Sequence, residues 1–167
     1  MHPFIYKKLF VKMSDKYHEE CFKSIKDESS KLRTYALFKT EVGLEPYLID
    51  IKNFDMRSKV TKFRLSNHKL SIETGRYDNI SKDERFCPFC PSEVEDEAHF
   101  LIKCHELRYL REKYLEPLIE SIDGFETLPL NSKIKFLMCK LDFNLYKFIS
   151  EGTDLRTFLL SNFRNRD

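Results

Sequence analysis

The amino-acid sequence predicts a mainly α-helical fold. Glycine is scarce, at four residues, and phenylalanine is abundant, at fifteen, a composition that disfavours a turn-rich β-sandwich. Apolar residues recur at helical spacing through most of the 167 residues, and they make up 41% of the chain. A chain of this length and composition can bury the core of one ordinary domain.

Two helices are expected in the first quarter of the chain. Apolar side chains at roughly helical spacing predict the first over residues 4–25. The second is expected over residues 28–42, where Ser29 or Ser30 can cap its start and Gly43 can close it.

The next stretch predicts a short helical turn, a longer helix and a loop. Pro46 can open the turn at residues 45–51, because proline suits the first helical position. Residues 55–70 predict a helix whose inward side chains are Met56, Val60, Phe63 and Leu65. Residues 71–84 predict a loop, with Gly75 as the expected position of positive φ.

Three more helices are expected after the central cysteines, over residues 105–122, 130–141 and 153–163. Pro117 should kink or split the first of them, because proline removes a backbone donor and clashes with the preceding turn. The apolar repeat of that helix consists of Leu107, Leu110, Tyr114, Leu118 and Ile122. The polar residues able to start the other two are Asn131 or Ser132, and Thr153 or Asp154.

Charge is distributed unevenly along the chain, although the net charge is only +2. Residues 52–85 hold nine Lys and Arg against five Asp and Glu, whereas residues 86–128 hold four against ten. A basic segment therefore runs directly into the cysteine-rich stretch, and an acidic segment follows it. The overall balance indicates no particular partner, but the local balance can.

The number and placement of cysteines favour a reduced environment. The chain has five, an odd number, and Cys21 and Cys139 are isolated in the sequence, which argues against a disulfide framework. The aromatic and basic start resembles no secretory signal, and no apolar run reaches the length of a membrane span. We therefore expect an intracellular protein without a membrane partner, and the sequence leaves nucleus and cytoplasm undecided.

The remaining three cysteines form a pattern with one histidine. Cys87 and Cys90 enclose Pro-Phe in a Cys-x2-Cys pair, and an eight-residue spacer leads to His99 and then Cys104. A Cys-x2-Cys turn lets two thiolates converge on one ion, and zinc then needs two further ligands to complete a tetrahedron. A helix is expected to start at the acidic residues 95–97, which suit the positive end of its dipole.

The spacing of His99 and Cys104 constrains the geometry of the helix that carries them. Positions 99 and 104 are about 140° out of phase on an ideal α-helix, so the helix must end or tighten before Cys104. His105 is a rival fourth ligand, and a redox dithiol or plain core cysteines are the alternatives to a metal. Four ligands leave no open coordination position, so the predicted zinc is structural and no catalytic residue is assigned.

The predicted fold is therefore a small helical domain built around a Cys3His zinc knuckle, with flanking helices. We expect an N-terminal helical segment at residues 1–52, a zinc-binding module at 53–122 with its knuckle at 85–105, and a C-terminal helical segment at 123–167.

Several stretches together resemble a known family. The runs SSKLRTYALFK, EPYL, KFRLSNHKLSIETGRY, RFCPFC and EDEAHFLIKC resemble the zinc-binding region that follows the polymerase domain in reverse transcriptases of non-LTR (LINE-type) retrotransposons. The resemblance covers roughly residues 29–115. It implies that Cys87, Cys90, His99 and Cys104 are the ligands, and that the region helps to hold RNA or DNA for a neighbouring polymerase domain.

The chain departs from that family where catalysis is concerned. A reverse transcriptase needs paired aspartates, commonly in a Tyr-x-Asp-Asp turn, and the run Arg76–Asn79 lacks the adjacent second aspartate. A length of 167 residues is also too short for a whole polymerase. We therefore expect an isolated C-terminal piece of such a protein, without enzymatic activity.

Two function classes stay open at this point. The first is a nucleic-acid-binding zinc module whose basic stretch contacts the phosphates of RNA or DNA. The second is a protein-interaction or scaffolding module whose basic residues pair with its own acidic helix at residues 106–120. A clustered positive surface would favour the first, and intramolecular pairing the second. The candidate phosphate contacts are Arg57, Lys59, Lys62, Arg64, Lys69, Arg76 and Arg85.

Overall fold

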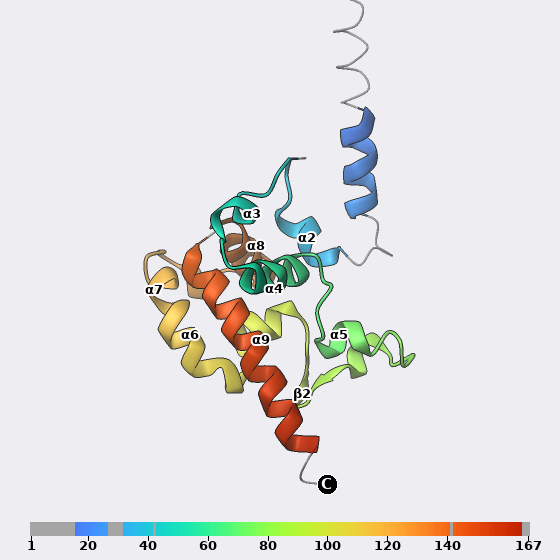
Figure 1. The fold of residues 1–167 in the computed structure, drawn as a ribbon, viewed down its shortest axis with the longest axis vertical. Helices are drawn as coiled ribbons and strands as arrows, with labels where there is room; N and C mark the ends of the chain where they lie inside the picture. Colours follow the sequence, from blue (N-terminus) through green and yellow to red (C-terminus); the bar gives the residue numbers. More distant parts are fainter. Residues whose placement is uncertain (1–15, 27–31, 42, 141, 165–167) are drawn as a thin grey trace, which may run out of the picture.

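The computed structural model describes residues 16–26, 32–41, 43–140 and 142–164, and they form a mainly α-helical fold as predicted (Figure 1). The elements in chain order are a helix at residues 16–26, α2 (Arg33–Phe38), α3 (Tyr47–Asp50), α4 (Phe54–Arg64), α5 (Ser71–Thr74), the strands β1 (Phe86–Cys87) and β2 (Cys90–Val94), a π-helix (His99–Lys103), α6 (Arg108–Tyr114), α7 (Glu116–Ile119), α8 (Leu130–Lys140) and α9 (Phe143–Arg164). Short 3-10 turns occupy Lys82–Glu84, His105–Leu107 and Phe125–Thr127.

The long helix α9 organises the arrangement. Both α4 and α6 pack against it, and α2 packs against α8 (Figure 1). One hydrophobic core runs through these contacts, and Phe38, Val60 and Phe148 all belong to it. These three residues come from the three predicted segments, which therefore share a core in the structure. The division of the chain into those segments stays a prediction.

Local signals located several elements correctly. The helix predicted over residues 55–70 is α4, which buries Val60 and Phe63 as expected. Its start is capped by Asn53, a residue that the sequence analysis did not single out, whose side chain accepts a hydrogen bond from the Met56 amide at 2.9 Å. Pro117 lies in the first turn of α7, and the predicted long helix is split between α6 and α7. The described part of the first predicted helix is helical over residues 16–26, and its start lies outside the described residues.

The predicted start of the last helix was wrong. The helix begins at Phe143, ten residues before Thr153, and it runs through Gly152 without interruption. Asp142 provides the start signal, because its carboxylate accepts a hydrogen bond from the Asn144 amide at 2.7 Å. Glycine at position 152 allows close packing inside this helix, since a Cβ there would lie 2.9 Å from Cζ of Phe100.

The prediction for Gly75 was also wrong. Its φ is −61°, and the described residues with positive φ are Ser66, Asn79 and Gly124. A Cβ at position 75 would lie 2.8 Å from Cγ of Arg85, so glycine is needed there for a close approach and not for its torsion angle. The predicted loop also contains the short helix α5.

Among the described residues, no helix has the length and apolar character that a membrane crossing requires.

Replacing Gly152 with alanine should destabilise the domain, although alanine is the better helix former. Phe100 packs between Phe63 and Phe148, with ring centroids 5.1 and 5.7 Å away, so its ring has little room to yield. We expect a net loss of about 1–2 kcal/mol, because overpacking outweighs the gain of about 1 kcal/mol in helix propensity. Urea unfolding measures it. Gly43→Ala is the control, because nothing lies within 4 Å of a Cβ there. Equal stability of the two variants would contradict the prediction.

Candidate metal centre

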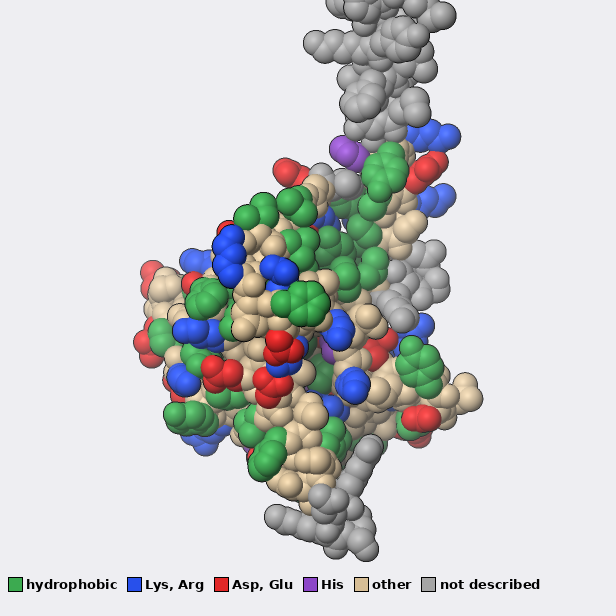
Figure 2. Space-filling model, in the orientation of Figure 1, with side chains coloured by type: hydrophobic (Ala, Val, Ile, Leu, Met, Phe, Trp, Pro, Cys, Tyr) green, Lys and Arg blue, Asp and Glu red, His purple; other side chains and the backbone are tan. Residues whose placement is uncertain are grey.

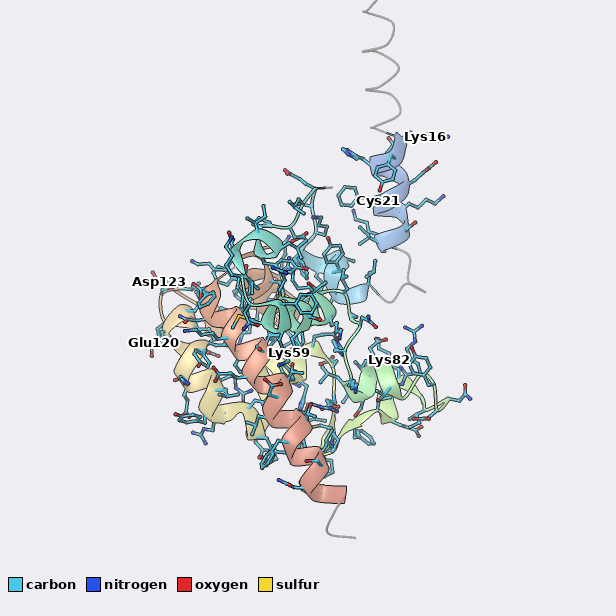
Figure 3. The ribbon with its side chains drawn as sticks, in the orientation of Figure 1. Lys16, Cys21, Lys59, Lys82, Glu120 and Asp123 are labelled. Carbon is cyan, nitrogen blue, oxygen red and sulfur yellow. The ribbon has the colours of Figure 1, made fainter. Side chains whose placement is uncertain are left out.

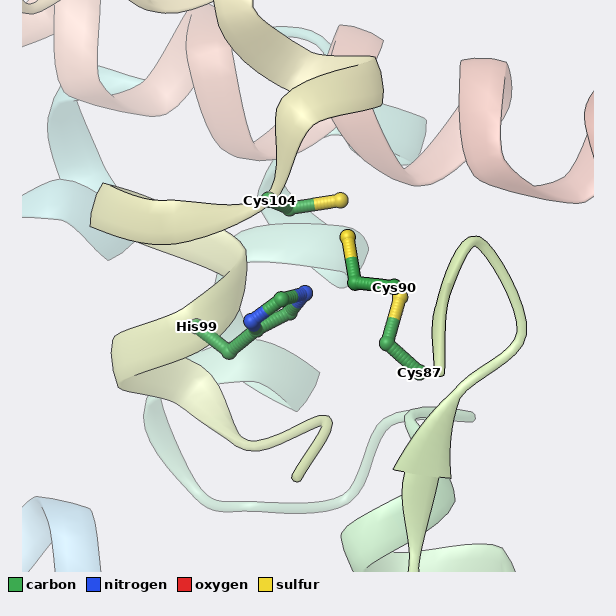
Figure 4. Close-up of side chains that lie close together, drawn as sticks. All are labelled: Cys87, Cys90, His99 and Cys104. Atoms are coloured by element: carbon green, nitrogen blue, oxygen red, sulfur yellow. The ribbon is translucent and has the colours of Figure 1, made fainter. Parts of the chain in front are cut away.

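The four predicted metal ligands lie together in the structure. The ligand atoms of Cys87, Cys90, His99 and Cys104 all fall within 4.8 Å of one another. Figure 4 shows two of them on the hairpin side and two on the helical side, with their side chains pointing toward one another. Ligands of a tetrahedral zinc ion with Zn–S bonds of about 2.3 Å stand roughly 3.8 Å apart. The spacing therefore suits a single metal ion.

A two-stranded hairpin presents the first pair of cysteines. Strands β1 and β2 are antiparallel, and Cys87 lies opposite Cys90 across the turn. The turn residue Phe89 is buried and contacts Phe163 of α9, with the ring centroids 5.6 Å apart. Packing of Phe89 therefore anchors the turn against the helix while the two thiols stay on the inner side of the hairpin.

A π-helix presents the second pair, and it resolves the geometric problem posed by their spacing. The Cys104 amide donates a hydrogen bond to the His99 carbonyl at 2.8 Å, a bond across five residues. Such a wide turn brings positions five apart nearly into line, whereas an α-helix would leave them far out of phase. The helix ends before Cys104, as predicted. Its last turn is wider than an α-helical turn, whereas the sequence analysis had considered a tighter one.

His99 has the environment of a metal ligand. Its side chain is 2% exposed, and neither ring nitrogen has a hydrogen-bond partner among the described residues. An imidazole buried without partners is costly, because both nitrogens have lost their hydrogen bonds to water. A metal ion bound to one nitrogen would remove the larger part of that cost. None of the cluster cysteines is in a disulfide.

His105, the rival ligand, lies at the edge of the cluster. Its Nδ1 is 3.0 Å from the Cys90 sulfur, and its Nε2 is 2.9 Å from a carboxylate oxygen of Glu106. The His105 side chain is 61% exposed, so water can satisfy its ring. His99 therefore fits the ligand role better, and His105 is placed to support the Cys90 sulfur.

The thiols influence one another strongly. A hydrogen bond from Cys87 lowers the pKa of Cys104 to about 3, and the same bond, with burial, raises the pKa of Cys87. Burial raises the pKa of Cys90. Of these thiols, Cys104 is the one whose pKa shift favours the thiolate form. A divalent ion binds thiolates, so binding must release the remaining protons.

The acidic run before His99 has a larger role than the predicted interaction with a helix dipole. Asp96 does accept a hydrogen bond from the His99 amide at 2.8 Å, as expected at a helix start. Glu95 and Glu97 are instead buried, each 2% exposed. Glu97 contacts Ser66 at 2.6 Å and His68 at 2.9 Å.

Glu95 connects the segment that carries His99 and Cys104 to two other elements. Its carboxylate receives two hydrogen bonds from the Arg156 guanidinium of α9, at 2.5 and 2.6 Å. It also accepts from the amide and hydroxyl of Ser71, at 2.6 and 2.7 Å, and so caps the start of α5. No sequence pattern indicates these contacts, because the partners lie 24 and 61 residues away.

Sequence reasoning also missed Arg111, one turn into α6. One of its guanidinium nitrogens donates to the carbonyl oxygen of Cys104. No local pattern marks this arginine, because it lies in an ordinary amphipathic stretch of charged residues.

Most of the predicted phosphate contacts are used inside the protein. Lys59 pairs with Asp55 and, at 2.7 Å, with Asp154, at the place where α9 crosses α4 (Figure 3). Arg76 pairs with Glu73 at 3.5 Å.

The other three arginines of that set donate to backbone or buried groups. Arg57 donates to the Ile51 carbonyl at 2.9 Å, and Arg85 donates to the carbonyls of residues 72 and 80. Arg64 is 2% exposed, pairs with Glu45 at 2.9 Å, and donates to a backbone carbonyl. Its assignment as a phosphate contact was wrong, because its guanidinium is withdrawn into the core.

Lys62 and Lys69 differ from the rest of the set. Both are exposed, and neither forms an ion pair with any residue the structure describes. The face shown in Figure 2 has positive and negative side chains interspersed, without a continuous positive surface. The carboxylates that pair with the predicted set come from residues 45, 55, 73 and 154, and not from the expected acidic helix.

Comparisons with known proteins identify no relative. No family model, curated protein or solved structure matches the chain. The resemblance to retrotransposon reverse transcriptases therefore stands on the quoted runs of sequence alone.

Replacing Cys104 with serine should abolish metal binding and loosen residues 85–105, because a hydroxyl is a poor substitute for a thiolate ligand. Metal content by elemental analysis and hydrogen exchange of that segment measure both effects. Cys139→Ser should change neither, since Cys139 lies outside the cluster. His99→Ala and His105→Ala form a second matched pair. Loss of the tetrahedral site in the second variant alone would show that His105 is the ligand.

Proposed function

We propose that the protein is a zinc-stabilised module that binds nucleic acid through its phosphate backbone. The buried Cys3His cluster carries the zinc part of the proposal, because three soft thiolates and one imidazole around a single point are a donor set typical of structural zinc. Zinc binding to such sites contributes about 10 kcal/mol or more near neutral pH, comparable to the stability of a whole domain. The ion would thus hold the hairpin and the π-helix together.

A groove between α4, α5 and α9 supports the nucleic-acid part. It has a volume of about 520 Å³. Apolar side chains such as Phe63 and Phe100 contribute to its lining. Its polar lining includes Lys59, Lys62, His68, Lys69, Tyr77 and Arg156, together with the carboxylates of Asp55 and Asp154.

Three residues of the groove are available to a ligand. Lys62 and Lys69 are exposed, and lysine can contact a phosphate as a compact positive charge. Tyr77 is 78% exposed, and stacking of a base on an aromatic ring is worth about 1–3 kcal/mol. A single strand can offer a phosphate and an unpaired base at once, so we propose single-stranded RNA or DNA as the ligand.

The internal pairing of the basic residues favours a second candidate function. A module whose cations stabilise its own fold can serve as a scaffold or protein-interaction domain without contacting nucleic acid. Exposed aromatic residues such as Phe54, Phe158 and Phe163 are compatible with protein contacts. Binding to an oligonucleotide separates the two candidates directly.

We propose no enzymatic activity for the chain. Four protein ligands would close the coordination sphere of the ion, and a catalytic zinc needs an open position. Template-dependent nucleotide incorporation or strand cleavage that tracks with the purified chain would refute this part.

The origin and location of the protein follow as proposals from the same residues. The quoted runs support descent from the zinc-binding region of a LINE-type element, with the polymerase domain of the parent element as a partner. Co-elution of the chain with such a domain in size-exclusion chromatography tests the partnership. Free cysteines around a metal site suit a reducing, intracellular compartment.

Reversing Lys62 and Lys69 to glutamate should weaken binding to single-stranded RNA about tenfold or more at low salt, because two phosphate contacts become repulsive. Fluorescence anisotropy with a labelled oligonucleotide at several salt concentrations measures it. Each lost contact should also lower the salt slope by about 0.7 for a single strand. Zinc content should be unchanged.

Lys135→Glu with Lys140→Glu is the matched control, because it changes the net charge equally on α8, away from the groove. Equal effects of the two double changes would show a nonspecific charge response. Absence of binding by the unchanged chain at low salt would leave the scaffold as the better candidate.

A further inference from the structure

Arg111 is a half-buried cation that forms no ion pair with a carboxylate of the described residues. One guanidinium nitrogen donates to the Cys104 carbonyl, and the other, Nη1, is buried with no hydrogen-bond partner among the described residues. The buried guanidinium groups of Arg64 and Arg156 are each paired with a glutamate. No ion pair involving Arg111 occurs in the part of the chain that the structure describes.

The thiolates are the negative charges that could compensate it. Burial lowers the pKa of Arg111, whereas the charges of Cys104, of Cys90 and, to a smaller extent, of Glu112 raise it. Arginine stays protonated in proteins over the whole physiological range, so the group is a permanent positive charge beside the cluster.

A positive group beside the cluster would stabilise a bound divalent ion, because the ion and its ligands together carry a net negative charge. Three thiolates, a neutral imidazole and a divalent ion sum to one negative charge. An uncompensated charge in a buried site is unfavourable, because the protein replaces water as its surroundings. One guanidinium brings the sum to zero.

We propose that Arg111 is the counter-charge of the metal centre and sets its affinity for divalent ions. This inference rests on the proposed zinc site and extends it to a residue outside the ligand set. The charge sum also gives selectivity, because a monovalent ion would leave one negative charge and a trivalent ion one positive charge. Groups that surround metal ligands typically change metal affinity about 10- to 100-fold when they are removed.

Two variants separate charge compensation from simple positioning of the Cys104 backbone. Arg111→Gln keeps a donor for the carbonyl and removes the charge. Arg111→Lys keeps the charge and one donor. Arg108→Gln is the control on the same helix, because Arg108 is exposed and forms a surface pair with Glu112 at 2.9 Å.

The experiment measures the affinity of the full chain for Zn²⁺ by competition with a chromophoric chelator. We expect about a 10- to 100-fold loss for Arg111→Gln, a loss of only a few-fold for Arg111→Lys, and no change for Arg108→Gln. Substitution with Co²⁺ adds a spectroscopic readout. The thiolate-to-cobalt charge-transfer band should shift to lower energy in Arg111→Gln, because loss of a positive charge raises the energy of the sulfur electrons.

Other outcomes would overturn the proposal. Equal losses in Arg111→Gln and Arg111→Lys, with an unchanged cobalt band, would show that the guanidinium only positions the Cys104 backbone. Unchanged affinity in Arg111→Gln would show no role at all. If Arg111→Gln fails to fold, Arg111→Lys decides, since weak binding by a folded lysine variant contradicts a role of charge. An unchanged chain that binds neither ion would refute the zinc site itself, and a bound ion with unaffected variants would refute only the role of Arg111.

Discussion

The structure depends on the convergence of four ligand atoms from two separate pieces of chain. The hairpin sets Cys87 opposite Cys90, and the π-helix aligns His99 with Cys104. A two-stranded hairpin is marginally stable in water by itself, and a π-turn has poorer geometry than an α-turn. Interactions within each piece alone therefore stabilise its conformation only weakly. An ion bound by both would stabilise the two conformations together, which explains why a short hairpin and a π-turn occur at the cluster.

The carboxylates next to His99 extend the junction to the rest of the domain. Glu95 binds Arg156 on α9 and caps α5, while Glu97 contacts Ser66 and His68 after α4. Breaking a buried pair by removing one partner typically costs about 3–5 kcal/mol, because the other charge is left uncompensated. The segment that carries His99 and Cys104 is therefore connected by buried polar bonds to the same helices that form the groove. If the cluster binds a metal, its loss should disturb the groove as well.

Sequence patterns predicted the structural features that depend on neighbouring residues. They failed for features that depend on contacts with residues from distant parts of the chain. Pro117 split its helix and the ligand spacing identified the cluster, because each depends on neighbours in the sequence. Gly75 was misjudged because its role is to admit Arg85, which comes from another part of the chain, and no local pattern indicated that Gly152 admits Phe100. The helix α5 was missed for the same reason. Its first turn is capped by the carboxylate of Glu95, which directly follows β2, and not by a residue next to α5 in the sequence.

Arginine and lysine side chains of the basic stretch have different surroundings in the structure. The four arginines of the predicted set all donate to groups within the protein, whereas two of its three lysines are exposed without an ion pair among the described residues. Arginine has several donors and is weakly hydrated, so it suits buried polar contacts, while the strongly hydrated lysine ammonium favours the surface. The net charge of a sequence segment can therefore exceed the positive charge that the folded protein presents at its surface. If the groove binds nucleic acid, two lysines and one tyrosine set the scale of the interaction, and that scale implies weak binding that salt readily reverses.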